Sequence, residues 1–285
     1  DFEEKVINNF VDEYLSGRTP NPCVRCNSYV KWDTFINQAD KLGAKYIATG
    51  HYANIEKNNN QYKITRGKDK GKDQSYVLWG IPMETLSRTI LPLGNLRKRE
   101  VRQIALDNKF ENAQAPESME ICFIPDNNYK RFINEYAKDK VEKISKKGAT
   151  LNEDGEKIGE NDGFINYTVG QRRGIGLTNP EPLYVKEISS DKNSIVVSEK
   201  KSLFSKKCKI SNINWLNNKI KFPLDAFAQI RYNGQISEAK ISDKKGSIFA
   251  TFNKPQLAIT PGQSIVFYDK EEALLGGGII ELHES

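Results

Sequence analysis

The stretch Gly17-Arg18-Thr19-Pro20-Asn21-Pro22-Cys23-Val24-Arg25-Cys26-Asn27 separates two of the chain's four cysteines by only two residues. Proline fixes its own φ and pushes the residue before it towards extended geometry, so residues 19–22 are predicted to form a stiff, non-helical loop. Arg18 and Arg25 flank the thiols, and a nearby cation lowers a thiol pKa towards the reactive thiolate. This pattern indicates a functional site.

Helical periodicity begins just after this loop, with apolar residues spaced near 3.6 from Trp32 to Leu42. Asn27 or Ser28 is the predicted N-cap of that helix. Cys26 would then lie beside a helix N-terminus, where an anion is stabilised.

The third cysteine, Cys122, lies between apolar residues in Ser118–Pro125 and is predicted on a short buried strand. Three interpretations of the thiols remain open from the pattern. Cys122 is a core residue, as free cysteines often are. The thiols bind a structural zinc, although four ligands are needed and only Cys208 and two histidines remain. Or separated cysteines meet in space and exchange sulfur.

Seven short motifs follow one another along the chain: Asn21-Pro22-Cys23-Val24-Arg25-Cys26-Asn27, Ala48-Thr49-Gly50-His51-Tyr52, Lys72-Asp73-Gln74-Ser75-Tyr76, Ile121-Cys122-Phe123-Ile124, Gly170-Gln171-Arg172-Arg173-Gly174, Thr260-Pro261-Gly262-Gln263-Ser264 and Leu275-Gly276-Gly277-Gly278-Ile279-Ile280. Together they resemble the tRNA-specific 2-thiouridylases, the MnmA (TrmU) family, from near the first residue to near the last. One departure is large. The family opens with a Ser-Gly-Gly-x-Asp-Ser pyrophosphate loop, which this chain lacks, so it resembles a member without its N-terminal part.

Composition agrees with an ordinary globular protein. The 285 residues are 38% hydrophobic and 28% charged, and no run approaches the length of a membrane span. Four unevenly spaced cysteines do not suggest a disulfide framework, and a reducing cytoplasm is expected. The net charge of +6 and the pI near 8.9 are compatible with a nucleic-acid partner.

The first predicted domain, residues 1–145, is the C-terminal part of a doubly wound α/β PP-loop ATP-pyrophosphatase domain with a helical extension. Gly50 and His51 follow a predicted strand at Lys45–Thr49, where ligands of open α/β sheets bind. The other predicted elements are a helix in residues 1–16 that packs on a sheet, a strand at Tyr76–Ile81, an amphipathic helix at Lys98–Asn108 with Val101, Ile104 and Ala105 inward, and a helix at Tyr129–Tyr136.

A small central β-rich domain is predicted at 146–207, after a linker at Ser145–Gly148, with paired strands Tyr184–Ile188 and Ile195–Val197. Its Gly170–Gly176 segment is predicted to contact phosphate backbone. The basic run from Lys200 to Lys209 is interpreted as a solvated linker, with an RNA contact as the alternative. Clean alternation from Cys208 onward predicts a C-terminal antiparallel β-barrel at 208–285.

The resemblance implies that ATP, with magnesium, adenylates O2 of the wobble uridine in the anticodon stem-loop of certain tRNAs, and that sulfur then reaches C2. It implies Cys122 as the persulfide carrier, loaded by a sulfur-relay donor or cysteine desulfurase, and Cys26 as the nucleophile that forms a Cys26–Cys122 disulfide. This chemistry requires a thiolate of low pKa at Cys26 and a persulfide at Cys122 that is sheltered from solvent. It implies further site residues: Gly50 for ATP, and Asn21, Pro22, Cys23, His51, Lys72, Asp73, Gln74, Arg231, Tyr232 and Gln263 for tRNA.

Alternatives remain. Relatives often carry Asp at the position of Cys23, and a cysteine there permits ligation of an iron–sulfur cluster by Cys23, Cys26 and Cys122. A tRNA-binding protein without catalysis is a different class. A third class is another ATP-pyrophosphatase that uses the same fold on a different substrate. This class is disfavoured because such a reaction would not need the second thiol, Cys122. Without a pyrophosphate loop, we expect the isolated chain to be inactive and to aggregate, and an added upstream segment to restore AMP release.

Overall fold

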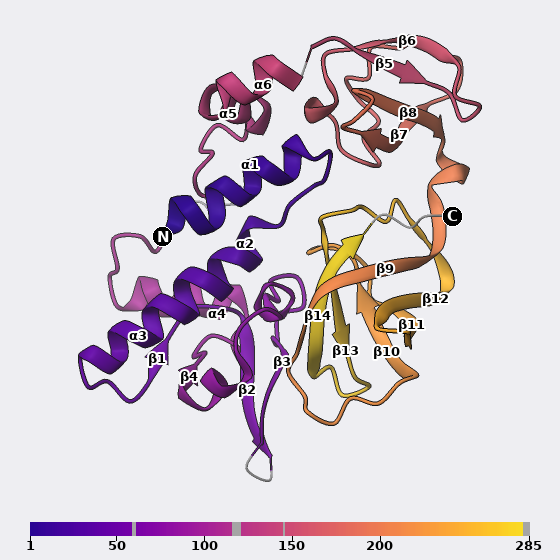
Figure 1. The fold of residues 1–285 in the computed structure, drawn as a ribbon. Helices are drawn as coiled ribbons and strands as arrows, with labels where there is room; N and C mark the ends of the chain where they lie inside the picture. The colour runs from indigo at the N-terminus through magenta and orange to yellow at the C-terminus, as the bar shows by residue number, and fades with distance from the viewer. Residues whose placement is uncertain (59–60, 116–120, 145, 282–285) are drawn as a thin grey trace.

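The computed structural model describes residues 1–58, 61–115, 121–144 and 146–281. Figure 1 shows a mixed helical region at the N-terminus, a small sheet beside helices α5 and α6, and a barrel formed by β9 to β14. The predicted motif residues Ser118, Met119 and Glu120 and the predicted linker residue Ser145 lie outside the described residues.

Two helical runs open the chain. The first is a turn of π-helix at Glu3–Ile7 continued by α1 at Asn8–Leu15, and the second joins α2 at Pro22–Arg25, a π-helical turn at Cys26–Trp32 and α3 at Asp33–Lys41. The helix predicted in residues 1–16 is confirmed, and in agreement with its predicted packing on a sheet, its core includes the strand residues Val185, Ile195 and Val197. Its buried side chains join the core of α5 (Tyr129–Tyr136) and α6 (Lys138–Ile144), and the ring of Tyr14 stacks on that of Tyr129 at 4.8 Å. An amphipathic stripe predicts that a face is buried but not which partner buries it.

The α/β part of this region is small within the described residues. β1 (Ile47–Ala48) pairs in parallel with β4 (Thr89–Ile90), which confirms the predicted strand before Gly50. β2 (Ala53–Asn58) and β3 (Gln61–Arg66) form an antiparallel hairpin.

The strand predicted at Tyr76–Ile81 is wrong. Residues Ser75–Leu78 form a buried 3₁₀-helix, and a turn follows. A short, continuously apolar run does not distinguish a buried strand from a buried helical turn by its periodicity.

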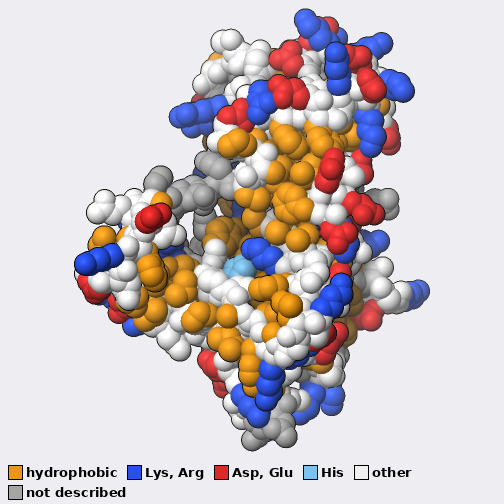
Figure 2. All heavy atoms as spheres, turned by 90° about the vertical axis from the view of Figure 1, so that its left-hand side faces the viewer, with side chains coloured by type: hydrophobic (Ala, Val, Ile, Leu, Met, Phe, Trp, Pro, Cys, Tyr) orange, Lys and Arg blue, Asp and Glu red, His pale blue; other side chains and the backbone are white. Residues whose placement is uncertain are grey.

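The helix predicted at Lys98–Asn108 is confirmed as α4 (Lys98–Asp107), and of its predicted inward residues Val101 and Ala105 are half-buried whereas Ile104 is exposed. No residue of α4 is buried, and the side chain of Ile104 is 47% exposed. Other large apolar side chains are also exposed, among them Leu42, Tyr46 and Ile90. Figure 2 shows hydrophobic side chains spread over the face that carries the N-terminal region.

The small sheet has the strand order β6-β5-β8-β7, with β5 at Gly148–Leu151, β6 at Lys157–Asn161, β7 at Leu183–Ser189 and β8 at Ser194–Glu199. β7 and β8 are antiparallel, so the predicted pair is confirmed, while β5 and β8 run parallel.

Six antiparallel strands close the barrel in the order β10-β11-β12-β9-β14-β13. Their bounds are Phe204–Trp215 for β9, Leu224–Gln229 for β10, Ser237–Lys244 for β11, Ser247–Leu257 for β12, Ser264–Tyr268 for β13 and Leu274–Glu281 for β14. The predicted alternation is confirmed, because Ala226, Ala228, Ile241, Ala250 and Phe252 all lie in the barrel core. The predicted basic linker is wrong at its end, since Lys206, Lys207 and Lys209 belong to β9.

The barrel packs against the N-terminal region, and this contact positions the site. Every residue of β13 is buried: Ile265 and Phe267 face the barrel core, whereas Val266 and Tyr268 join the core of the N-terminal region. A Cβ on Gly277 would lie 2.7 Å from the ring of Trp79, so glycine allows this close approach. Among the described residues, no helix combines the length and apolar character that crossing a bilayer requires.

Candidate active site

The loop that carries Cys23 and Cys26 is helical earlier than predicted. Asn21 caps α2 by accepting a hydrogen bond from the Val24 N–H at 3.4 Å, with Pro22 at the first helical position. Proline suits that position because its missing N–H would have no partner there. The predicted N-cap at Asn27 or Ser28 is therefore wrong: both residues lie inside the helical run and are buried.

The barrel holds the segment just before Asn21. The Thr19 N–H donates to the Pro261 carbonyl at 2.9 Å, and Gln263 Nε2 donates to the carbonyls of Thr19 and Pro20 at 3.0 and 2.9 Å. Gln263, which the resemblance assigns to tRNA, thus fixes the start of the cysteine loop. Arg18 adds an ion pair to Glu281 of β14.

The two arginines that flank the thiols in sequence point elsewhere. Arg18 pairs with Glu13 and Glu281, and Arg25 Nε donates to the Lys5 carbonyl at 2.8 Å. Burial raises the pKa of the Cys23 and Cys26 thiols. Lys31 is the cation that acts on both thiols, and its effect opposes desolvation but is smaller. The prediction of a low-pKa thiolate at Cys26 is wrong for the protein without its substrates.

Cys122 lies in a turn and is exposed, so the predicted buried strand is wrong. The turn is closed by a hydrogen bond from the Ile124 N–H to the Ile121 carbonyl at 2.9 Å. Phe123 and Ile124 anchor it, with the Phe123 ring 5.3 Å from that of Phe10. The apolar neighbours Ile121 and Phe123 are half-buried on either side of the exposed thiol.

One cavity of about 370 Å³ gathers residues that lie far apart in the sequence. It is lined by the thiols Cys23, Cys26 and Cys122 and by Phe2, Val6, Asn21, Pro22, Asn27, Lys31, His51, Gln74, Val77, Ile121, Phe123 and Tyr232. Cys208 lies apart, in the barrel core, where burial raises the pKa of its thiol to about 12. The three cavity thiols therefore form the candidate reactive group.

Three family models match the chain: the tRNA methyl transferase HUP domain at residues 1–126, the tRNA methyl transferase PRC-barrel domain at 130–199 and the aminomethyltransferase beta-barrel domain at 205–280. A protein of Halothermothrix orenii named tRNA-specific 2-thiouridylase MnmA is 44% identical over 98% of this chain and 78% of its own length. Proteins of the same name from Amoebophilus asiaticus and Clostridium perfringens are 45% and 40% identical, over 75% and 77% of their lengths. The chain belongs to the MnmA family. The predicted fold class is confirmed with it.

His51 of this MnmA-family chain lies at the carboxyl side of β1 and lines the cavity. Its side chain is buried, its Nδ1 lies 2.9 Å from Thr49 Oγ1, and its ring packs near Trp32. Burial, with a smaller effect from Lys31, lowers the pKa of His51 to about 4. The imidazole is therefore neutral near pH 7 and offers hydrogen bonds rather than charge.

We expect the protein to lose stability as the pH falls from about 6.5 to about 4, because in this window the unfolded histidine binds a proton that folded His51 does not. The loss in unfolding free energy is on the order of 3 kcal/mol, and it ends once both states are protonated. Urea unfolding at several pH values measures it. His51→Gln should flatten this dependence, and an unchanged slope in that variant would contradict the assignment.

The remaining predicted site residues surround the cavity. Gln74 lines it and accepts a hydrogen bond from the Tyr52 N–H at 3.0 Å, while Asp73 pairs with Arg66 and accepts from the Gly67 N–H. Asp73 thus organises the loop that carries Lys72. Gly50 is exposed after β1.

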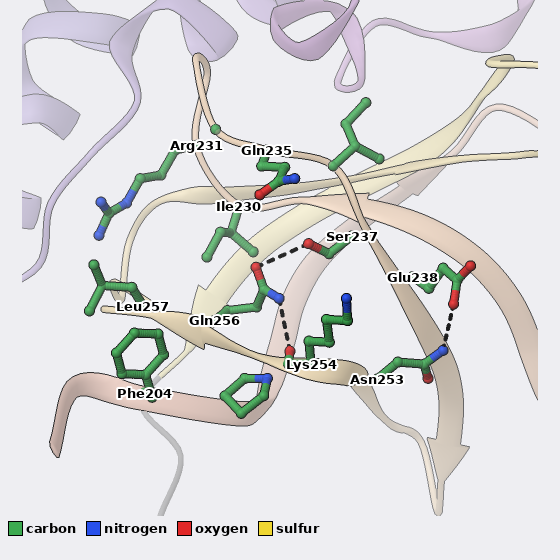
Figure 3. A pocket seen from close by; sticks show the side chains of 13 residues that line it. Phe204, Ile230, Arg231, Gln235, Ser237, Glu238, Asn253, Lys254, Gln256 and Leu257 are labelled. Carbon is green, nitrogen blue, oxygen red and sulfur yellow. Dashed lines mark hydrogen bonds between the residues drawn. The ribbon is translucent and has the colours of Figure 1, made fainter. Parts of the chain in front are cut away.

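Tyr232 lines the cavity from the barrel side and is 37% exposed. Arg231 Nη2 donates to the Ala258 carbonyl at 2.7 Å and borders a second hollow of about 570 Å³ on the barrel (Figure 3). There the polar side chains form hydrogen bonds with one another, such as that from Ser237 Oγ to Gln256 Oε1 at 3.3 Å (Figure 3). The reactive groups belong to the thiol cavity, not to this hollow.

Lys31 and Asn27 line the cavity although the sequence pattern did not predict them there. A π-helical turn spans Cys26–Trp32, and its i to i+5 hydrogen-bond spacing brings Cys26 and Lys31 to the same side. A periodicity of 3.6 gives no signal for this. Among the described residues, no three or more His, Cys, Asp or Glu side chains form a group able to hold a metal ion.

Proposed function

We propose that this chain is a tRNA sulfurtransferase that forms 2-thiouridine at the wobble position of tRNA. The observation that carries the proposal is the single cavity in which Cys23, Cys26 and Cys122 meet His51 and Gln74. Sulfur transfer needs separated thiols in one space, whereas a binding protein does not. The relatives reported above carry the name tRNA-specific 2-thiouridylase.

ATP supplies the leaving group: the uridine O2 attacks the α-phosphate and pyrophosphate leaves, so that AMP can later depart from C2 with that oxygen. Gly50 suits the adenosine part, because it is exposed at the end of β1 and the nearest atom to an added Cβ is Leu93 Cδ1 at 3.7 Å. The described residues contain no glycine-rich loop of the Ser-Gly-Gly type that would hold the phosphates and their magnesium.

The two cysteines then divide the sulfur chemistry. A persulfide on Cys122 attacks C2 through its outer sulfur. The Cys26 thiolate attacks Cys122 Sγ, the S–S bond of the persulfide breaks, and its electron pair stays on the sulfur bound to C2, which expels AMP as C2=S forms. Cys26 and Cys122 are left as a disulfide that a reductant must reopen.

Exposure and charge support this division. Cys122 is exposed, so a sulfur-relay protein or cysteine desulfurase can reach and load it. Cys26 is half-buried in the same cavity, where Lys31 partly offsets the desolvation that raises its pKa.

Cys23→Asp separates this route from an iron–sulfur cluster. The three thiols share the cavity, but the described residues do not gather them as a metal-binding group. We therefore expect Cys23→Asp to keep most 2-thiouridine formation, measured by mass spectrometry of tRNA nucleosides. The assay uses the protein at the full length that its gene encodes. The cluster would be favoured instead if the anaerobically purified protein contained iron and absorbed at ~400 nm, and if Cys23→Asp lost both this absorption band and the activity.

tRNA binding is proposed across Tyr232, Lys72 and the exposed Arg172 and Arg173. We expect Tyr232→Ala to cost about 1–3 kcal/mol of binding free energy, because an aromatic ring stacks on a base, without changing the salt dependence. Arg173→Ala should lower the log–log salt slope by about one, because one phosphate contact is lost. Filter binding at several salt concentrations measures both. Tyr46→Ala, an exposed tyrosine outside the cavity, is the control, and equal effects of Tyr232→Ala and Tyr46→Ala would move the RNA surface elsewhere.

A further inference from the structure

Asn27 is a cavity residue with a side-chain oxygen that has no hydrogen-bond partner among the described residues. It follows Cys26 directly, lines the thiol cavity, and is 1% exposed. Its Nδ2 donates to the Val77 carbonyl at 3.0 Å. Its Oδ1 is buried and has no hydrogen-bond partner among the described residues.

The orientation of this amide is determined by its neighbour. The Val77 carbonyl accepts only, so a flipped Asn27 would place two acceptor oxygens together. Oδ1 must therefore be the free end. A buried acceptor without a donor costs free energy, and such a group in a native protein calls for an explanation.

The donors already near Asn27 do not satisfy it. His51 has its Nδ1 against Thr49 Oγ1. Gln74 has its Oε1 engaged by the Tyr52 N–H and its side chain also hydrogen-bonds Tyr232, which leaves one N–H of the Gln74 amide as a further donor lining the cavity. Asn27 and Gln74 thus offer an incoming ligand one acceptor and one donor.

We propose that Asn27 Oδ1 accepts a hydrogen bond from N3–H of the target uracil and thereby selects uridine against cytidine. The inference rests on the proposed function, because it needs the base in the thiol cavity. N3 is bonded to C2, the carbon that must lie beside the thiols, so a base in reacting position brings N3–H next to the residue that follows Cys26. Uracil presents a donor at N3 and an acceptor at O4, which complement Asn27 Oδ1 and Gln74 Nε2. Cytosine presents the reverse pattern, an acceptor at N3 and a donor at N4, and would oppose both groups.

Competition binding of anticodon stem-loops to the full-length protein tests this. Three stem-loops differ only in the wobble base: uridine, cytidine or N3-methyluridine. We expect the unchanged protein to prefer uridine over the other two by at least about tenfold, since a site built for a donor rejects ligands that lack it. In Asn27→Ala that preference should fall to less than about threefold. Asn37→Ala replaces an exposed asparagine of α3, and this control should keep the full preference.

N3-methyluridine alters the ligand rather than the protein, so the first comparison remains decisive if Asn27→Ala does not fold. Equal binding of uridine and N3-methyluridine by the unchanged protein would overturn the inference. So would an unaltered preference in folded Asn27→Ala. Failure of every stem-loop to bind would contradict the proposed function itself, and the two failures are thereby distinguished.

Discussion

Cys26→Ser and Cys122→Ser should each reduce 2-thiouridine formation below detection while leaving tRNA affinity within about threefold. A hydroxyl neither carries a persulfide nor attacks one, so either variant removes a bond-forming step. The base and phosphate contacts proposed for binding lie on other residues, such as Tyr232 and Arg173. The measurement is mass spectrometry of tRNA nucleosides from a strain that depends on the variant for thiolation.

Cys208→Ala is the matched control, because Cys208 is also a free thiol but lies in the barrel core. It should retain thiolation. A single turnover without reductant should leave Cys26 and Cys122 joined, visible as a cross-linked peptide pair. Normal thiolation by either serine variant would remove that cysteine from the mechanism.

The barrel and the first helix could be predicted because their patterns are local. Period-two alternation at Ala226, Ala228 and Ile230 describes one strand face whatever the strand packs against. The strand before Gly50 is short but follows α3, which ends at Lys41, and the φ of +67° at Gly43 is typical of a glycine just after a helix end.

The errors occurred where the environment of a side chain depends on distant segments. Cys122 has apolar neighbours in sequence, and Ile121, Phe123 and Ile124 pack in the core formed with α1, yet Cys122 itself is exposed. Arg18 is adjacent to the thiol loop in sequence, yet it pairs with Glu281, 263 positions away. The motifs therefore identified residues that gather at the site, but proximity in sequence identified neither the cation that acts on the thiols nor the direction of their pKa shifts.

The second large effect concerns Gly262, which controls the position of the cysteine loop from the barrel side. Its φ is +88°, and an added Cβ would lie 2.8 Å from the Thr19 carbonyl oxygen and 2.9 Å from the Thr19 nitrogen. These are backbone atoms, so they cannot rotate away. Thr19 is also tied to Pro261 and Gln263 by hydrogen bonds, so any displacement moves the segment that leads into Asn21 and the cap of α2.

We therefore expect Gly262→Ala to lower the thiolation rate by about a hundredfold, because a shift near 1 Å at reacting groups has that consequence. Gly246→Ala is the matched control. Gly246 has a φ of +82°, so its variant carries similar backbone strain, but nothing lies within 4 Å of an added Cβ. Both variants should lose about 1–2 kcal/mol of unfolding free energy from that strain, and Gly262→Ala should lose more because its Cβ also meets the Thr19 backbone; urea unfolding measures both losses. Only Gly262→Ala should lose thiolation, measured as 2-thiouridine per tRNA. Equal rates for the two variants would mean that the barrel contact does not set the position of Cys23 and Cys26.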